Sequence, residues 1–418
     1  MRITVDEALS LIENALCPVT GYVQKSFSDS VGNILAQPVV AQRNNPSVNN
    51  SAMDGYAFRW ASLEQNSHLD IESRRSLKIL NGVQAKPGFP PVTAPLGYAV
   101  RIFTGAPMPD DTDTVIQQEY VTVQEGKLHF PDETVALWHG MNCRLKGEDF
   151  TIGQALMAEG TRVLPHHIGL GHLAGIGKTS VMLRVPLVAS VLSTGDELTR
   201  QSLPDENSAE HTVCDCNAPM LMSWCKLLGV QTIDCGIISD HPDDVLQAID
   251  YASEFSDCIV ISGGASVGDR DYITTVISDT GELRLEGVAM KPGGPFAWGF
   301  WKGKPVFCLP GNPVACFVTF AIFVRPAIMR LSGMDWRTDQ RYNLPIAFDY
   351  PKKKGRREFV RVAVNPVTMM LEKVASQGSG IVTGLSLSHG LADFAETIAF
   401  AKTGDSIPFM PFSSLGLF

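Results

Sequence analysis

The chain has 418 residues, of which 44% are hydrophobic and 19% charged, and this composition is typical of an ordered globular protein with several domains. Its formal net charge of −10 argues against a general nucleic-acid-binding surface, which needs a basic footprint. We identify no apolar run of membrane-spanning length and no cationic leader, and the nine cysteines form no CxxC pair, so we expect a cytoplasmic protein with reduced thiols.

The first part of the chain combines a helix with a β-rich segment. Apolar residues of 5–16 recur at helical spacing, and Thr4 with Glu7 makes a capping-box pattern, so the sequence predicts an amphipathic helix there. From 47 to 147, short β-prone runs are separated by proline, glycine and aspartate, which predicts a β-rich module set into the chain. A strand and a helix that starts near Pro165 follow this module.

Between 184 and 333 the pattern alternates between strand and helix. The predicted helices are 217–229, 241–255 and 272–281, followed by an apolar helix after 312. Asn217 is the expected N-cap of the first of them. Such alternation predicts an α/β fold with a mostly parallel sheet that helices cover on both faces. From 334 onward, short strand-like runs predict a C-terminal β domain.

The most informative segment is DCIVISGGASVGDRDY. An apolar, β-branched strand leads directly into a loop with Gly263, Gly264, Ser266 and Gly268, and the backbone N–H groups of such a loop can surround a phosphate. Carboxylates follow at once, including Asp271, and they would repel a bare anion unless a divalent cation lay between acid and phosphate. The segment therefore predicts a site for a phosphorylated ligand with a bound metal ion.

Four further loops are expected at the same edge of the predicted sheet. In an open parallel sheet, ligands bind outside the carboxyl ends of the strands. The loops that follow the other strands, or lie between them, are 193–197, 239–244, 290–295 and 309–313. Their common position predicts one polar, anion-binding crevice.

Most of these loops also have a purely structural explanation. Asp240 can act as a helix N-cap, Glu197 can belong to a solvated helix start, and Asn312 with Pro313 makes a good cap for the apolar helix. Lys291 can be a surface lysine, although the adjacent glycine–proline turn favours a rigidly presented cation. The glycine-rich loop is harder to explain in this way, because its glycines lower stability and need a reason.

Two polar segments far away in sequence carry further acids. Residues 49–57 are small and polar around Asp54, and residues 143–150 place basic side chains beside Asp149. Taken singly, an ordinary loop and a solvated charge run explain both segments.

Together these segments resemble the molybdopterin molybdenumtransferase family, known as MoeA and as the E domain of gephyrin. The motifs that carry the resemblance occur in the family's order over nearly the whole chain: NSAMDGYA, RIFTGAP, GEDF, STGDEL, SGGASVGDRDY, MKPG and LPGNPV. The combination of NSAMDGYA with LPGNPV is far more specific than a lone phosphate-binding loop.

The resemblance implies an elongated subunit of four parts. These are a discontinuous N-terminal domain (1–46 plus 148–183), a β-rich inserted domain (47–147), an α/β molybdopterin-binding domain (184–333) and a C-terminal β domain (334–418). It also implies a homodimer in which the α/β domain of one subunit meets the inserted domain of the other, which would bring distant acids to the crevice. A molybdopterin adenylyltransferase is a candidate partner protein.

The implied reaction takes adenylylated molybdopterin and molybdate, and it releases molybdenum cofactor and AMP. The implied magnesium ligands are Asp240 and Asp271, and the ion would offset charge on the phosphoryl group. The residues that match catalytic positions of the family are Asp54, Asp149, Glu197, Asp240, Asp271 and Lys291. The implied substrate-binding residues are Thr104, Asn217, Gly263, Gly264, Ser266, Gly268, Pro310, Gly311, Asn312 and Pro313.

The chain departs from the family pattern on both sides of Lys291. Many relatives carry a basic residue shortly before this lysine and another in the motif PGKP, whereas this chain has Gly287 and Gly294. Fewer cations would weaken the binding of a doubly charged oxyanion. The alternative hypothesis is a divergent paralogue that binds molybdopterin or the finished cofactor without insertion activity. A metal-dependent phosphohydrolase fits the loops alone but does not explain NSAMDGYA.

Overall fold

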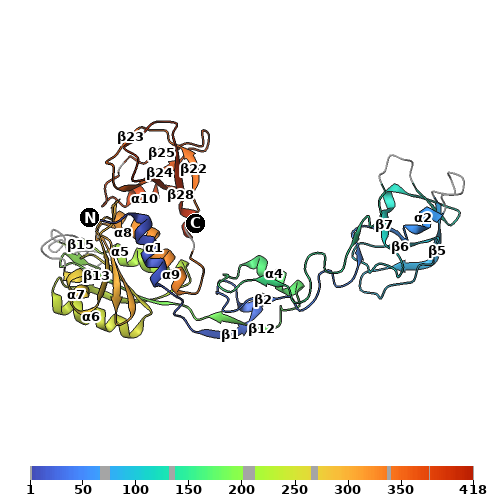
Figure 1. Cartoon of the computed structure of the whole chain (residues 1–418), viewed down its shortest axis with the longest axis horizontal. Coiled ribbons are helices and arrows are strands. Elements are labelled where there is room, and N and C mark those ends of the chain that lie inside the picture. The colour runs from blue at the N-terminus through green and yellow to red at the C-terminus, as the bar shows by residue number, and fades with distance from the viewer. Residues whose placement is uncertain are drawn as a thin grey trace.

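The computed structural model describes residues 2–65, 76–130, 137–200, 212–264, 272–336, 340–375 and 377–417. The molecule is elongated (Figure 1). An α/β unit and a β unit lie together at one end, a β-rich lobe lies at the other end, and a small middle part connects them. Both labelled chain ends lie at the α/β end.

Helix α1 (Val5–Ala15) starts at the predicted capping box. The Glu7 N–H donates to Thr4 Oγ1 at 3.2 Å, and the Thr4 N–H donates to Glu7 Oε2 at 2.7 Å. The apolar face of α1 is buried in the same core as α9 (Arg325–Leu331). The structure therefore packs α1 onto the α/β unit, although the division expected from the sequence placed it in a domain with 1–46.

The middle part is built from segments on both sides of the inserted lobe. Strand β1 (Tyr22–Ser26) pairs with β12 (Ser180–Arg184), and β2 (Val39–Val40) pairs with β11 (Ala155–Met157), both antiparallel. Helix α4 (Pro165–Leu173) covers them. Segments more than a hundred residues apart in sequence thus share one small core.

The lobe at the far end contains a six-stranded sheet of order β7-β4-β6-β5-β9-β8. Its strands are β4 (Gly55–Phe58), β5 (Ser76–Ala85), β6 (Tyr98–Ile102), β7 (Thr114–Gln117), β8 (Thr122–Gln124) and β9 (Lys127–His129). Its other elements are β3 (Asn50–Ser51), which pairs with β10 (Cys143–Arg144), helix α2 (Ala61–Gln65) and a turn, η3 (Gln118–Tyr120). A Cβ at Gly55 would lie 1.9 Å from the Ile116 carbonyl oxygen, so the close approach of β4 to β7 requires this glycine.

The α/β unit has a six-stranded sheet of order β16-β13-β17-β21-β20-β18, in which the first four strands are parallel and β20 is antiparallel to both of its neighbours, β21 and β18. The strands are β13 (Val188–Thr194), β16 (Gln231–Ile238), β17 (Cys258–Ser262), β18 (Glu282–Glu286), β20 (Ala297–Trp301) and β21 (Lys304–Leu309). The helices are α5 (Asn217–Leu227), α6 (Pro242–Phe255), α7 (Tyr272–Thr280), α8 (Pro313–Thr319), η4 (Phe320–Val324) and α9.

Strand β17 shows why the strands of this sheet are continuously apolar in sequence. Cys258 and Val260 face a core that contains α5, α8 and α9, whereas Ile259 and Ile261 face a second core that contains α6 and α7. Helices therefore cover both faces, as the alternating pattern predicts.

The continuous helical stretch Pro313–Leu331 is long and apolar enough to cross a membrane by length and composition. The expectation that no apolar run reaches such a length is therefore wrong. In the structure 89% of an 18-residue part of this stretch is buried inside the protein, and the stretch forms the centre of the α/β core.

The C-terminal unit is built on the sheet β19-β24-β26-β28-β22, with β25 paired to β24. Its strands are β19 (Met290–Lys291), β22 (Tyr342–Pro345), β23 (Tyr350–Pro351), β24 (Arg357–Val364), β25 (Leu371–Lys373), β26 (Gly390–Phe394), β27 (Phe400–Ala401) and β28 (Ser406–Pro411). Helical turns α10 (Thr383–Ser386) and η5 (Phe412–Leu415) complete it. Strand β19 comes from the α/β part of the sequence, so the two units share a sheet.

Replacement of Trp224 by alanine tests the packing of the two units. The indole is 2% exposed, lies 4.8 Å from the rings of Phe317 and Phe320, and donates to the Leu415 carbonyl at 3.2 Å. We expect Trp224→Ala to lower the free energy of unfolding by about 3–5 kcal/mol in urea denaturation. The control Leu227→Ala removes an exposed side chain of the same helix, and an equal loss in both variants would contradict the packing described.

Candidate functional site

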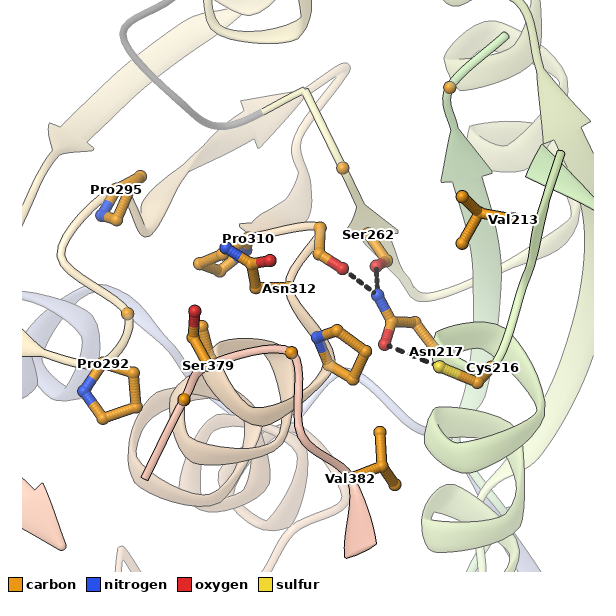
Figure 2. A pocket seen from close by; sticks show the side chains of 18 of the residues that line it. Val213, Cys216, Asn217, Ser262, Pro292, Pro295, Pro310, Asn312, Ser379 and Val382 are labelled. Carbon is orange, nitrogen blue, oxygen red and sulfur yellow. Dashed lines mark hydrogen bonds between the residues drawn. The ribbon is translucent and has the colours of Figure 1, made fainter. Parts of the chain in front are cut away.

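The loops at the carboxyl ends of the parallel strands surround one open cavity of about 1080 Å³. Each of the five loops expected at the crevice contributes to it. Figure 2 labels residues from three of these loops, namely Ser262, Pro292 with Pro295, and Pro310 with Asn312. The contributing residues from these loops are Thr194, Gly195, Glu197, Asp240, Ser262, Gly263, Gly264, Lys291, Pro292, Gly293, Pro295, Pro310, Gly311, Asn312 and Pro313.

Asn217 ties several walls of the cavity together. It lies in the first turn of α5, whose N-cap is Cys216, so the prediction of Asn217 as N-cap is wrong. Asp215 instead accepts the N–H groups of Asn217 and of the next residue, at 3.1 and 3.2 Å. The side-chain amide of Asn217 is thereby available to donate to Ser262 Oγ at 2.8 Å and to the Gly311 carbonyl at 2.7 Å (Figure 2).

Asp215 is itself held by an arginine between two acids. Arg200 Nε lies 3.1 Å from Asp215 Oδ2, and Arg200 Nη1 lies 2.5 Å from Asp234 Oδ2. The hydrogen bond from Arg200 lowers the pKa of Asp234, and the same bond raises the pKa of Arg200. The positive charge of Arg200 is thus paired with two acids of the protein itself.

The start of the glycine-rich loop touches the end of β13. Gly263 has φ +104°, and a Cβ there would lie 2.4 Å from the Thr194 carbonyl oxygen. Gly264 has φ +59°, and a Cβ there would lie 2.5 Å from Ile273 Cδ1. Both positions require glycine, which explains the composition of the loop without a ligand at these two residues.

The structural explanations considered for two of these loops have different outcomes. Helix α6 has His241 as its N-cap and no side-chain capping bond, so the explanation of Asp240 as the cap is wrong. Asn312 is the N-cap of α8, with Pro313 in the first turn as predicted, although the Asn312 side chain makes no capping bond. Both residues line the cavity, as do Glu197 and Lys291.

A wall from the C-terminal unit is absent from the sequence-based prediction. Glu358, which is 3% exposed, accepts Arg356 Nε at 2.8 Å and the Tyr350 hydroxyl at 2.8 Å. Burial raises the pKa of Tyr350, and the bond to Glu358 raises it further. The carbonyl of Ser379 accepts the Val314 N–H at 2.9 Å and so closes the start of α8. The signal that could have indicated this wall was Glu358, a carboxylate at the start of the otherwise mostly apolar run EFVRVAV.

The remaining predicted site residues are not among the described residues that line the cavity. Ser266, Gly268 and Asp271 fall outside the described residues. Asp54 and Thr104 lie on the far lobe, before β4 and after β6 (Figure 1). Asp149 lies between this lobe and the middle part, where its Oδ2 accepts the side-chain N–H of Asn45 at 2.8 Å.

Asp54 and Thr104 form a local pair on the surface of the lobe. Asp54 Oδ1 accepts both the backbone N–H and the hydroxyl of Thr104, each at 2.7 Å. These bonds lower the pKa of Asp54, with a smaller contribution from Arg101. The carboxylate therefore stays ionised to lower pH than an ordinary aspartate, because hydrogen bonds to the charged form favour it.

Removal of the Thr104 hydroxyl tests this pair. Thr104→Val removes one donor, so we expect the pKa of Asp54 to rise and the group to protonate at higher pH than in the wild type. Carbon-13 NMR titration of labelled aspartate carboxyls measures the change. Thr104→Ser keeps the hydroxyl and should keep the wild-type titration, whereas a shift of equal size in both variants would contradict the assignment.

Comparisons with known proteins cover almost the whole chain. Residues 3–177 match the MoeA N-terminal region (domain I and II), 190–330 match a probable molybdopterin binding domain, and 343–412 match the MoeA C-terminal region (domain IV). The molybdopterin molybdenumtransferase of Haemophilus influenzae is 30% identical over 99% of both chains. That of Nostoc sp. is 31% identical over 90% of this chain and 85% of its own.

The solved structures that the fold resembles lead to the same family. The molybdopterin biosynthesis MoeA protein of Pyrococcus horikoshii aligns with a TM-score of 0.75 and 26% identity over 99% of both chains. A second structure of a P. horikoshii MoeA protein aligns with a TM-score of 0.80 at 22% identity, which supports the fold. With an α/β unit, a C-terminal β unit and a crevice in the arrangement described above, the chain belongs to the molybdopterin molybdenumtransferase (MoeA) family of molybdenum cofactor biosynthesis.

Proposed function

We propose that this transferase inserts molybdenum from molybdate into adenylylated molybdopterin with release of AMP. The observation that carries the proposal is the convergence of five polar loops, each expected from the sequence, on one cavity large enough for a dinucleotide-sized ligand. In this proposal the peptide groups around Gly263 and around 310–313 hold anionic parts of the ligand. Lys291 supplies positive charge, and Glu197 and Asp240 act at the phosphoryl group.

The described residues fit a magnesium ion that arrives with the substrate. No group of three or more potential ligands that could hold a metal occurs among them. Mg²⁺ usually takes one or two protein carboxylates and completes its shell with substrate phosphates and waters, and Asp240 in the cavity offers such a carboxylate. We propose Asp240 and Asp271 as its ligands. When bound, the ion would neutralise charge on the phosphates.

We further propose that the active form is a homodimer. Asp54, Thr104 and Asp149 lie away from the crevice of their own chain, at the other side of the middle part (Figure 1). A second copy in the opposite orientation would bring them to the crevice, since a two-fold interface makes each contact twice. Asp54, which is held ionised by Thr104, would then act on a ligand bound by the partner.

The division into four domains remains our proposal. The middle part, the inserted lobe, the α/β unit and the C-terminal unit each have buried apolar clusters of their own. We therefore retain boundaries near 47, 148, 184 and 334, with α1 packed on the α/β unit.

We also propose a cytoplasmic location, which the free thiols at all nine cysteines support. The adenylyltransferase that makes the substrate is the partner protein to test.

An AMP-release assay tests the proposed reaction. With adenylylated molybdopterin, molybdate and Mg²⁺, we expect the purified protein to form molybdenum cofactor and AMP in equal amounts. Chelation of Mg²⁺ or the change Asp240→Asn should lower kcat by about 10²-fold or more, because charge stabilisation at the phosphoryl group is lost. Asp111→Asn on the far lobe is the control. Tight pterin binding without AMP release would instead identify the non-inserting paralogue.

Mixing of two inactive variants tests the homodimer. If the site takes Asp54 from one subunit and Asp240 from the other, each mixed dimer of Asp54→Asn and Asp240→Asn contains one intact site. After co-refolding or co-expression in equal amounts, we expect about a quarter of the wild-type activity, whereas each variant alone stays inactive. No recovery, with mixed dimers confirmed by native mass spectrometry, would place both acids in the same subunit's site.

A further inference from the structure

The N-terminal residues run beside the segment that presents Lys291. Ile3 forms a parallel β-bridge with Val288, and its carbonyl accepts the N–H of the following Ala289 at 2.8 Å. Lys291 and the residues after it form one wall of the crevice. The residue before Ile3 is Arg2, so a guanidinium group lies next to this wall.

Arg2 lies over the two glycines that flank Lys291. A Cβ at Gly294 would lie 2.8 Å from Arg2 Nη1, and a Cβ at Gly287 would lie 3.1 Å from Arg2 Nε. Gly294 itself stands between Gly293 and Pro295, which both line the cavity. The guanidinium thus fills the space that a side chain at either glycine would need.

The charges around the cavity show why a cation is needed there. The described lining residues include the carboxylates of Glu197, Asp215, Asp240 and Glu358 but only one basic residue, Lys291. Asp215 is neutralised by Arg200 and Glu358 by Arg356. Among the described lining residues the acids thus outnumber the bases, and like charges beside an anionic ligand disfavour its binding.

Arg2 is suited to this task by its exposure. Its side chain is exposed, and it makes no hydrogen bond or ion pair with any of the described residues. Its five N–H donors are therefore available to a ligand, and the planar fork of guanidinium matches the oxygen edge of a tetrahedral oxyanion.

We propose that Arg2 is a binding residue of the crevice, where it and Lys291 together hold a tetrahedral dianion. This inference rests on the function proposed above. Two sources share this chemistry, free molybdate and the phosphate of the pterin substrate. Glycine at 287 and 294 then leaves the space that the Arg2 side chain occupies. The positive charge of Arg2 reaches this wall of the crevice from the N-terminal segment.

Kinetics of the full-length protein test the role of Arg2. For Arg2→Ala we expect the KM for the anion to rise about tenfold with little change in kcat, the effect of one lost charge-assisted contact. Arg2→Lys should recover part of the affinity. Arg284→Ala removes an exposed arginine elsewhere in the α/β unit and should leave both KM values unchanged. A rise in the KM for molybdate identifies molybdate as the ligand, and a rise for the pterin substrate identifies its phosphate.

The double variant Arg2→Ala/Gly294→Lys provides a sharper test. Removal of Arg2 takes away the closest contact of a Cβ at residue 294 and leaves the Met290 carbonyl oxygen at 3.2 Å, so a lysine there should restore part of the affinity that Arg2→Ala loses. Equilibrium dialysis of molybdate and of the pterin substrate, without turnover, should follow the same order of affinities. Wild-type affinity for both ligands in Arg2→Ala would overturn the inference. An inactive wild type would instead refute the proposed reaction, and the dialysis would still decide the role of Arg2.

Discussion

The side-chain amide of Asn217 is the contact on which the architecture of the crevice depends. It donates to Ser262 at the end of β17 and to the carbonyl of Gly311 after β21, and it is 7% exposed. Buried amides of this kind are costly when unpaired, so the two loops and the start of α5 are held in a single arrangement. Asp215 makes this possible, because it takes over the capping of α5 and is kept in place by Arg200.

The charged residues of the cavity form two groups, one that is paired within the walls and one that lines the open space. Asp215 and Glu358 are nearly buried and paired with arginines, and they stabilise the walls. Glu197, Asp240 and Lys291 line the open space. A polyanionic ligand with a divalent ion satisfies such a mixture, since the ion separates the carboxylates from the phosphates.

Much of this arrangement could be predicted from the sequence because it depends on local rules. The capping box of α1, the alternation that gives the parallel sheet, and the position of five loops at one edge all follow from short-range patterns. The misassigned cap at Asn217 shows the limit of these rules. An amide beside a helix start satisfies a capping pattern, but its partners come from loops some 45 and 94 residues away in sequence.

The C-terminal wall and the packing of α1 were missed for the same reason. Glu358 and Ser379 reach the crevice because β19 pairs with β24. These strands are far apart in the chain, and no sequence pattern within either strand indicates that they pair. Likewise, the apolar face of α1 indicates burial but not the core in which it is buried. The apolar helix after 312 was predicted within the α/β part, but its membrane-spanning length was overlooked, and composition alone does not distinguish a buried core helix from a helix in lipid.

The shared sheet has a mechanical consequence. Lys291 lies on β19, whose neighbour is β24 of the C-terminal unit, and it stands in register with Glu358. The lysine is therefore anchored to one unit by the chain and to the other by backbone hydrogen bonds. A rotation of the C-terminal unit would carry this strand with it and move Lys291 relative to the loops of the α/β unit. If Lys291 binds an anion as proposed, the rigidity of the β19–β24 pairing would then help to set how long the ligand stays bound, independently of the chemistry of the loops.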